Sequence, residues 1–253
     1  MAVSFDRVAS VYDATRWSGV PPEIMKKLLQ TMKELFAGCR PILDVGIGTG
    51  RFAEYFNDSG FTIVGVDLSL SMMAKAREKR LRDLFQADAH HLPFRDRAFD
   101  GAIMIHVLHL VRDWVQVVGE VGRVTRKVIV AEVEGGEGFS PRQRYLELRQ
   151  EMGYSLDRFN DGEAGLRRVV PPAIVKLVGD YWTEVDVHEE IDSFDRRKSS
   201  VSWGIPAEVN TRIIQRLHSE NPEKTVRRRE IVEVVGWDSA QLRNLTTRGT
   251  SPN

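Results

Sequence analysis

Short apolar runs alternate with amphipathic segments between residues 42 and 136, and this rhythm constrains the fold more than any other feature. The apolar runs cover residues 42–46, 61–69, 84–89, part of 99–111, and 127–136. Segments with helical spacing of apolar residues separate them, at residues 49–57, 71–81 and 113–125. Continuous apolar strands that alternate with helices are typical of a parallel sheet covered on both faces. About one hundred residues are therefore predicted to form a doubly wound α/β core.

Glycines and acidic residues stand where the first three predicted strands end. The first strand leads through Asp44 into Gly46, Gly48 and Gly50, while Asp67 ends the second strand and Asp88 the third. Glycines allow a tight turn and bring a ligand against bare main chain, next to a helix N-terminus. In an open α/β sheet, ligands bind beyond the carboxyl ends of the strands. This ordered set predicts a binding site for a small molecule.

The spacing of the glycines argues against a nicotinamide dinucleotide as that ligand. The dinucleotide fingerprint requires a glycine at position 51, which is Arg51 here. Asp44 precedes the first glycine by two residues, and its negative charge would repel a pyrophosphate. An acid in this place suits an ammonium or sulfonium group. The pattern therefore favours a nucleoside that carries a cationic amino-acid part.

The same motifs closely resemble those of the class I S-adenosylmethionine-dependent methyltransferases. ILDVGIGTG resembles their first motif and VGVDLS their second, and QADAHHLPFRDRAFDGAIMIHVLHLV resembles the third and fourth. The resemblance covers about residues 40–136. The segment FDRVASVYD near the N-terminus is similar to the opening of the ubiquinone/menaquinone-biosynthesis methyltransferase group, where it folds over the cofactor.

The resemblance implies S-adenosyl-L-methionine as cofactor and assigns roles to individual residues. It places the three glycines along the methionine part, Asp44 at the amino group and Asp67 at the ribose. Leu68 belongs to the same site, and Asp88 with Ala89 meets the adenine. His106, at the end of the fourth strand, would line the methyl-transfer cavity, and His106 and Tyr12 are the candidate catalytic residues. The implied activity is methyl transfer by in-line displacement to a small organic acceptor.

The whole chain is predicted to be one Rossmann-like domain with a mostly parallel sheet of seven strands. An N-terminal helical flap (1–38) precedes the cofactor-binding core (39–136). A helical lid (137–182) and C-terminal strands with a helix (183–246) follow. Outside the core we predict helices at 21–36, 141–159 and 206–219, and an irregular-to-helical segment at 162–181. Strands are predicted at 183–191 and, at the sheet edge, at 229–237.

Several side chains admit a structural interpretation beside the functional one. The glycines could be turn residues only, and Asp67 could cap a helix. His106 could be a core histidine, His109 a packing or surface residue, and His90 and His91 loop residues. The aromatic residues after the core could line an acceptor pocket or anchor a small core of their own; they are Tyr145, Tyr154, Phe159 and Trp182. The basic triplets 196–198 and 227–229 could contact phosphate or form a solvated face.

Composition limits the classes of partner. The 36 Lys and Arg residues balance 36 Asp and Glu residues, which favours a small-molecule enzyme over a nucleic-acid scaffold. A tRNA methyltransferase and a non-catalytic S-adenosylmethionine-binding module remain the alternatives. The single Cys39 excludes an internal disulfide and a Cys-built zinc site, and no metal is predicted. The N-terminus lacks the apolar run of a signal peptide, so a cytoplasmic protein without a membrane segment is expected.

Overall fold

The computed structural model describes residues 19–111, 113–132, 135–137, 140–154, 162–195, 202, 204–243 and 245. The chain divides into two compact units. The first holds the described residues of 1–134, 158–179 and 232–253, and the second holds those of 135–157 and 180–231. The strands β7 (Ile174–Asp186) and β8 (Thr225–Asp238) contribute residues to both units.

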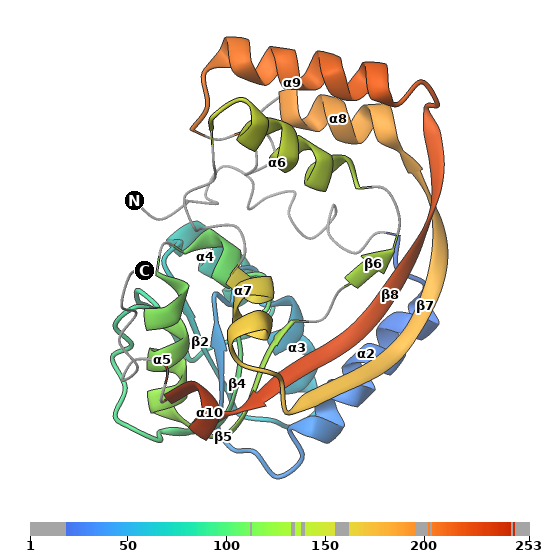
Figure 1. Ribbon diagram of the computed structural model, residues 1–253. Helices are drawn as coiled ribbons and strands as arrows, with labels where there is room; N and C mark the ends of the chain where they lie inside the picture. The colour runs from blue at the N-terminus through green and yellow to red at the C-terminus, as the bar shows by residue number, and fades with distance from the viewer. Residues whose placement is uncertain are drawn as a thin grey trace. The chain divides into compact units, whose positions relative to one another are not determined.

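The first unit is built on parallel strands in the order β3-β2-β1-β4-β5 (Figure 1). Their bounds are β1 (Ile42–Val45), β2 (Ile63–Asp67), β3 (Leu84–Gln86), β4 (Phe99–Ile103) and β5 (Thr125–Glu132). Leu43 of β1 lies beside Val64 of β2 on one side and Ala102 of β4 on the other. The strand order therefore reverses at β1, the position where open α/β sheets bind ligands. The Rossmann-like, doubly wound fold is confirmed.

Antiparallel pairing extends this sheet beyond β5. Ile129 of β5 lies opposite Trp237 of β8, and β6 (Gly135–Glu137) and β7 also pair with β8. The described residues thus form eight strands, one more than the sequence predicted. The strand expected at 229–237 is confirmed, but it begins at Thr225 and is not at the sheet edge, because it has β5 and β6 as neighbours.

Helices cover both faces of the parallel strands. They are α2 (Pro22–Leu35), α3 (Arg51–Asp58), α4 (Leu70–Glu78), the short 3-10 helix η1 (Leu108–Leu110), α5 (Trp114–Val124), α7 (Gly162–Val169) and α10 (Ser239–Arg243). Figure 1 shows α5 and α10 on one face and α2 and α3 on the other. On the second face the Phe36 ring packs so closely on β4 that a Cβ at Gly101 would lie 2.7 Å from it.

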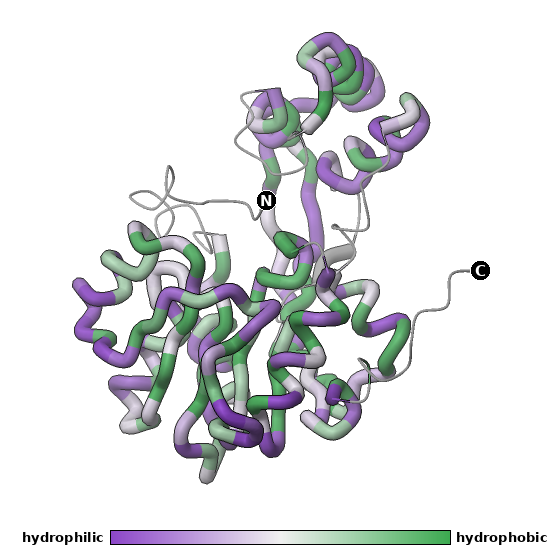
Figure 2. Tube along the Cα trace, turned by 90° about the vertical axis from the view of Figure 1, so that its left-hand side faces the viewer, coloured by the Kyte–Doolittle hydropathy of each residue, from purple (hydrophilic) through white to green (hydrophobic). Residues whose placement is uncertain are grey.

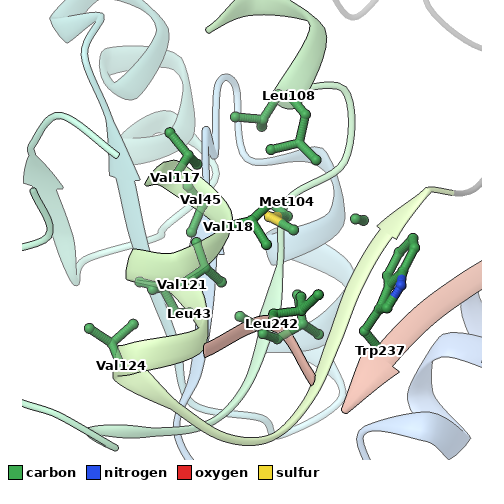
Figure 3. Close-up of a cluster of buried hydrophobic side chains, with 14 of the residues drawn as sticks. Leu43, Val45, Met104, Leu108, Val117, Val118, Val121, Val124, Trp237 and Leu242 are labelled. Atoms are coloured by element: carbon green, nitrogen blue, oxygen red, sulfur yellow. The ribbon is translucent and has the colours of Figure 1, made fainter. Parts of the chain in front are cut away.

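One apolar cluster fills the space between the sheet and α5. Val117, Val118, Val121 and Val124 are fully buried on the sheet-facing side of α5. Figure 3 shows them with Leu43, Val45, Met104, Leu108, Trp237 and Leu242. Burial of side chains of this size stabilises the fold by about 1.5–3 kcal/mol each. The cluster holds the carboxyl ends of β1 and β4 in fixed positions.

The second unit has a core of its own. Its helices are α6 (Pro141–Glu151), α8 (Val187–Asp195) and α9 (Ala207–Glu220), and Figure 2 shows hydrophobic and hydrophilic residues along them. Tyr145, Ile191, Phe194 and Ile213 are buried in its centre, and the Tyr145 hydroxyl donates a hydrogen bond to Asn210 Oδ1. Tyr145 therefore anchors a small core.

The other aromatic residues named above lie elsewhere or at the margin of this core. Tyr154 is partly buried against it. Trp182 is 56% exposed, with the Arg227 guanidinium 4.8 Å from its ring centroid. Phe159 and the triplet 196–198 lie outside the described residues.

The second basic triplet forms ion pairs and a ring contact within the fold. Arg228 pairs with Glu230, and Arg229 Nε lies 2.7 Å from Asp180 Oδ2. With Arg227 over the Trp182 ring, each of the three arginines has a partner in the protein. The arrangement is that of a charge-paired surface.

The segments after the core differ most from expectation. Residues 174–186 are a strand, so the expected helical lid at 137–182 is interrupted, and the second unit joins 135–157 to 180–231. The strand expected at 183–191 is wrong from residue 187 onward, where α8 begins. Val187, Ile191 and Phe194 are buried at the spacing of a helix, in which apolar residues repeat about every 3.6 residues. This helical pattern decides the structure here, and the alternation every second residue that predicted a strand does not.

Candidate functional site

The glycine turn after β1 has left-handed backbone geometry at all three predicted glycines. The φ angles are 68° at Gly46, 55° at Gly48 and 77° at Gly50, a region that residues with a Cβ rarely adopt. The backbone N–H groups of Gly46 and Ile47 both donate to Val66 O, at 2.8 and 3.0 Å. The turn is thereby fixed to the end of β2.

The lack of a side chain at these glycines also lets other elements approach. A Cβ at Gly46 would lie 2.6 Å from Val107 Cγ2, in the loop after β4. A Cβ at Gly50 would lie 2.4 Å from Leu81 Cδ1, in the segment after α4. The glycines therefore allow the loop after β4 and the segment after α4 to approach the turn closely.

Asp67 joins the glycine turn to the start of α4. Its Oδ2 accepts a hydrogen bond from the Gly48 N–H and its Oδ1 one from the Ser69 N–H, each at 2.8 Å. The cap of α4 is Ser69, whose Oγ accepts from the Met72 N–H at 3.1 Å. The helix cap is therefore Ser69, while Asp67 connects the turn to the start of α4. Leu68, next to it, is 44% exposed.

Asp44 is a buried acid inside β1, with 6% of its surface exposed. Burial raises the pKa of Asp44 to about 8, the negative charge of Asp67 adds to this rise, and the positive charge of Arg51 opposes it. A cationic group placed beside Asp44 would favour its ionised form. The two acids therefore make this end of the sheet receptive to positive charge.

Asp88 and Ala89 follow β3, which ends at Gln86, two residues before Asp88. Asp88 Oδ1 accepts from the His90 N–H at 2.9 Å and lies 2.6 Å from His90 Nδ1. Burial alone would raise the pKa of Asp88, but these hydrogen bonds and the nearby histidine charge lower it below its ordinary value. Ala89 is partly buried against the main core. His90 and His91 are loop residues, as expected, and Gln116 contacts both.

His106 lies in the loop after β4, three residues beyond Ile103, where the strand ends. It adopts a left-handed backbone conformation with φ 60°. Its ring lies edge-to-face against His109, with 6.2 Å between ring centroids. The loop that carries it also carries Val107, which contacts the glycine turn. The loop that carries His106 therefore contacts the turn through Val107.

His109 makes a specific contact that the sequence did not indicate. Its Nδ1 lies 3.1 and 3.2 Å from the two carboxylate oxygens of Glu163, which also accepts a hydrogen bond from the Leu108 N–H at 3.1 Å. Glu163 is 54 residues away in the sequence, on α7, in a segment predicted to be a lid. The one local signal in the sequence was that Glu163 is an acidic residue in the first turn of an amphipathic helix. Many helices have such a residue, so the signal does not indicate a functional role.

Two further expectations concern residues for which the structure gives limited information. Tyr12 and the segment 5–13 lie outside the described residues, and the flap at 1–38 is described from residue 19 onward. Among the described residues, no group of three or more His, Cys, Asp or Glu side chains could hold a metal ion.

Comparison with protein families identifies the core. Residues 43–128, which contain the glycine turn, Asp67, Asp88 and His106, match the family described as "Methyltransferase domain". This part of the chain is therefore similar to methyltransferase domains.

Curated relatives of the methyltransferase domain act on different acceptors according to their names. A demethylmenaquinone methyltransferase from Renibacterium salmoninarum is 33% identical over 138 residues, covering 52% of this chain and 58% of the relative. A malonyl-[acyl-carrier protein] O-methyltransferase from Hamiltonella defensa is 30% identical over 127 residues, covering 50% of this chain and 48% of the relative. The chain thus spans about half to three fifths of the length of these relatives.

A solved structure extends the likeness of fold beyond the methyltransferase domain. A Bacillus halodurans C-125 protein assigned to the methyltransferases is 19% identical, with a TM-score of 0.53, and the match covers 83% of this chain and 98% of that one. At this identity the likeness concerns the fold alone. Within the described part of the chain, none of the helices combines the length and apolar character needed to cross a membrane.

Proposed function

We propose that this protein transfers a methyl group from S-adenosyl-L-methionine to a small organic acceptor. One observation carries the proposal: Asp44, Asp67 and Asp88 lie at or just beyond the carboxyl ends of three neighbouring parallel strands, around a turn of left-handed glycines. This arrangement offers negative charge and oxygen atoms that can accept hydrogen bonds from hydroxyl groups at one edge of the sheet. It lies in the segment that matches the methyltransferase family.

The residues present fit the parts of the cofactor one by one. The backbone of Gly46–Gly50 would lie along the methionine part, and Asp44 would bind the ammonium group. Asp67 would hold the ribose hydroxyls, since an ionised carboxylate accepts hydrogen bonds through both of its oxygens. Asp88 and Ala89 would meet the adenine, beside the exposed Leu68. The cofactor supplies a methyl group activated on a sulfonium when it is bound.

The protein's own contribution to the reaction is placement and exclusion of water. Methyl transfer is an in-line displacement, so holding both reactants in line supplies much of the rate. His106 and Tyr12 are the candidate side chains beside the reacting atoms. A small organic acceptor is supported by the relatives, whose names specify a quinone precursor and a malonyl thioester.

Titration calorimetry with S-adenosylhomocysteine tests the cofactor assignment. The native chain should bind one molecule, and Asp67→Ala should lose about 1–3 kcal/mol of binding free energy because two charge-assisted hydrogen bonds to the ribose are lost. Asp58→Ala, at the exposed end of α3, is the matched control and should bind normally. Sub-stoichiometric binding by the native chain, or unchanged binding by the Asp67 variant, would refute the assignment.

A second assay addresses the acceptor. Release of S-adenosylhomocysteine is measured with a quinol, a thioester-linked carboxylic acid and total tRNA offered separately. Turnover with one of the two small molecules supports the proposal. Turnover with tRNA alone would show that the acceptor is a nucleic acid and not a small molecule. If no acceptor is turned over although the cofactor binds stoichiometrically, the protein would be a non-catalytic binding module.

A further inference from the structure

A carboxylate and two histidines form a connected group beside the end of β4. Glu163 accepts a hydrogen bond from the Leu108 N–H at 3.1 Å and contacts His109 Nδ1 through both carboxylate oxygens. The side chains of His109 and Glu163 are each 17% exposed. The His109 ring in turn lies against the ring of His106, with an interplanar angle of 79°. The three side chains are therefore linked through direct contacts.

The fold favours an ionised Glu163 at this position. Burial alone would raise the pKa of Glu163, but the hydrogen bond and charge of His109, with the charge of His106, lower it below its ordinary value. The neighbouring Gly162 allows α7 to approach, because a Cβ there would lie 2.3 Å from the Leu108 carbonyl carbon. The start of α7 is thus packed directly on the backbone of the His106 loop.

His106 is held in a conformation that the chain does not adopt by itself. A histidine with φ 60° is uncommon and persists where surrounding contacts determine it. The contacts on its C-terminal side are those of Leu108 and His109 with Glu163. The intervening Val107 lies against the glycine turn. Glu163 therefore fixes the loop that presents His106 beside the candidate cofactor site.

We propose that Glu163 is a positioning residue, which acts through His109 to orient His106 as the proton acceptor for a hydroxyl-bearing methyl acceptor. This inference rests on the proposed function. In the step, an oxygen electron pair forms the bond to the methyl carbon, and the carbon–sulfur electron pair leaves on sulfur. The hydroxyl proton passes to the His106 ring, so the positive charge moves from sulfonium to imidazolium. The Glu163 carboxylate favours the imidazolium, and a nucleophile that is already ionised would need no such group.

Nuclear magnetic resonance of histidine ring carbons tests the coupling without turnover. In the native chain, adding S-adenosylhomocysteine should shift the His106 signal, because that ring borders the ligand. In Glu163→Gln the His106 ring signal should differ from that of the native chain before any ligand is added, because the contact that reaches His106 through His109 is changed. Glu163→Asp should restore part of the difference. Glu233→Gln is the matched control, since Glu233 pairs with Arg167 of the same helix, α7.

Kinetics separate positioning from folding. With a naphthohydroquinone as acceptor, Glu163→Gln should lower kcat by about tenfold or more, with KM for S-adenosylmethionine within about twofold. Its affinity for S-adenosylhomocysteine should equal that of the native chain. Equal loss in kcat for a carboxylic acid acceptor, or a His106 ring signal unchanged in Glu163→Gln, would overturn the inference. Failure of the native chain to bind S-adenosylhomocysteine would instead overturn the proposed function.

Discussion

Asp44 shows at the scale of one residue how the candidate site differs from the rest of the core. It occupies a buried position of β1 between apolar neighbours, where burial and the charge of Asp67 disfavour its ionised form. A valine or leucine would fit such a strand at lower cost in free energy. The cofactor site proposed above would account for the acid, because its cationic ammonium group would lie beside Asp44.

Asp44→Asn should stabilise the free protein. The pKa of Asp44 is raised from 3.8 to about 8 in the fold, so the unfolded chain loses this proton first as the pH rises. The native stability therefore falls from about pH 4 to about pH 8, and the amide removes this loss. At pH 8 the free energy of unfolding of the variant should exceed that of the native chain by on the order of 2–5 kcal/mol, as measured by urea titration.

The same substitution should weaken the binding of S-adenosylhomocysteine by about tenfold or more, because the ammonium group loses a charged partner. The gain in stability should nearly vanish at about pH 4, where the native carboxyl is protonated in both states. Parallel stability curves for the two proteins across this range would contradict the assigned burial of the charge.

Arg123 shows at the scale of elements how a helix is joined to a loop. The guanidinium, in the last turn of α5, contacts Glu120 and Asp96 and donates to the carbonyl oxygens of Leu92 and Phe94. These carbonyls belong to the segment that connects β3 to β4. One side chain therefore fixes a loop of the core that has no regular structure of its own.

Arg123→Ala should lower the free energy of unfolding by about 1–3 kcal/mol, because several charge-assisted hydrogen bonds are lost and Glu120 remains partly buried. Arg126→Ala is the matched control: its side chain is 48% exposed, and its pair with Asp100 should contribute at most about 0.5 kcal/mol. Thermal unfolding of the two variants measures the difference. Equal decreases in Tm would show that the loop is held by other contacts.

At the scale of the molecule, each of the two compact units has a buried apolar cluster among its described residues. One lies between the sheet and α5 and supports the candidate cofactor site, and the other lies among α6, α8 and α9. The methyltransferase match, residues 43–128, lies entirely in the first unit, which the chain enters again in β8.

Replacing a buried side chain by alanine should have different effects in the two cores. Ile129→Ala and Ile191→Ala each remove a fully buried isoleucine and should cost about 2–5 kcal/mol of local stability. Hydrogen exchange should rise in β4 and β5 for the first variant and in α8 and α9 for the second. Ile191→Ala should retain the native affinity for S-adenosylhomocysteine. Loss of binding in that variant would show that the second unit takes part in the cofactor site.

The sequence by itself determined the parallel core and most of the candidate site. The strands at residues 42–45, 63–67 and 99–103 were predictable because burial on both faces produces continuous apolar runs. The glycine turn was predictable because its backbone geometry restricts the residue type. Asp67 and Asp88 followed from their place at strand ends, since parallel strands end at the same edge of a sheet.

Only the tertiary structure decided which distant residues complete this edge. Glu163 meets His109 across 54 residues, and Gly162 permits the contact by lacking a side chain. Neither residue has a local pattern that distinguishes it from a common helix start. The switch from strand to helix at Val187 was likewise decided by packing, because Ile191 and Phe194 are buried in the second core. Local periodicity specifies an element, whereas contacts between elements depend on how the whole chain folds.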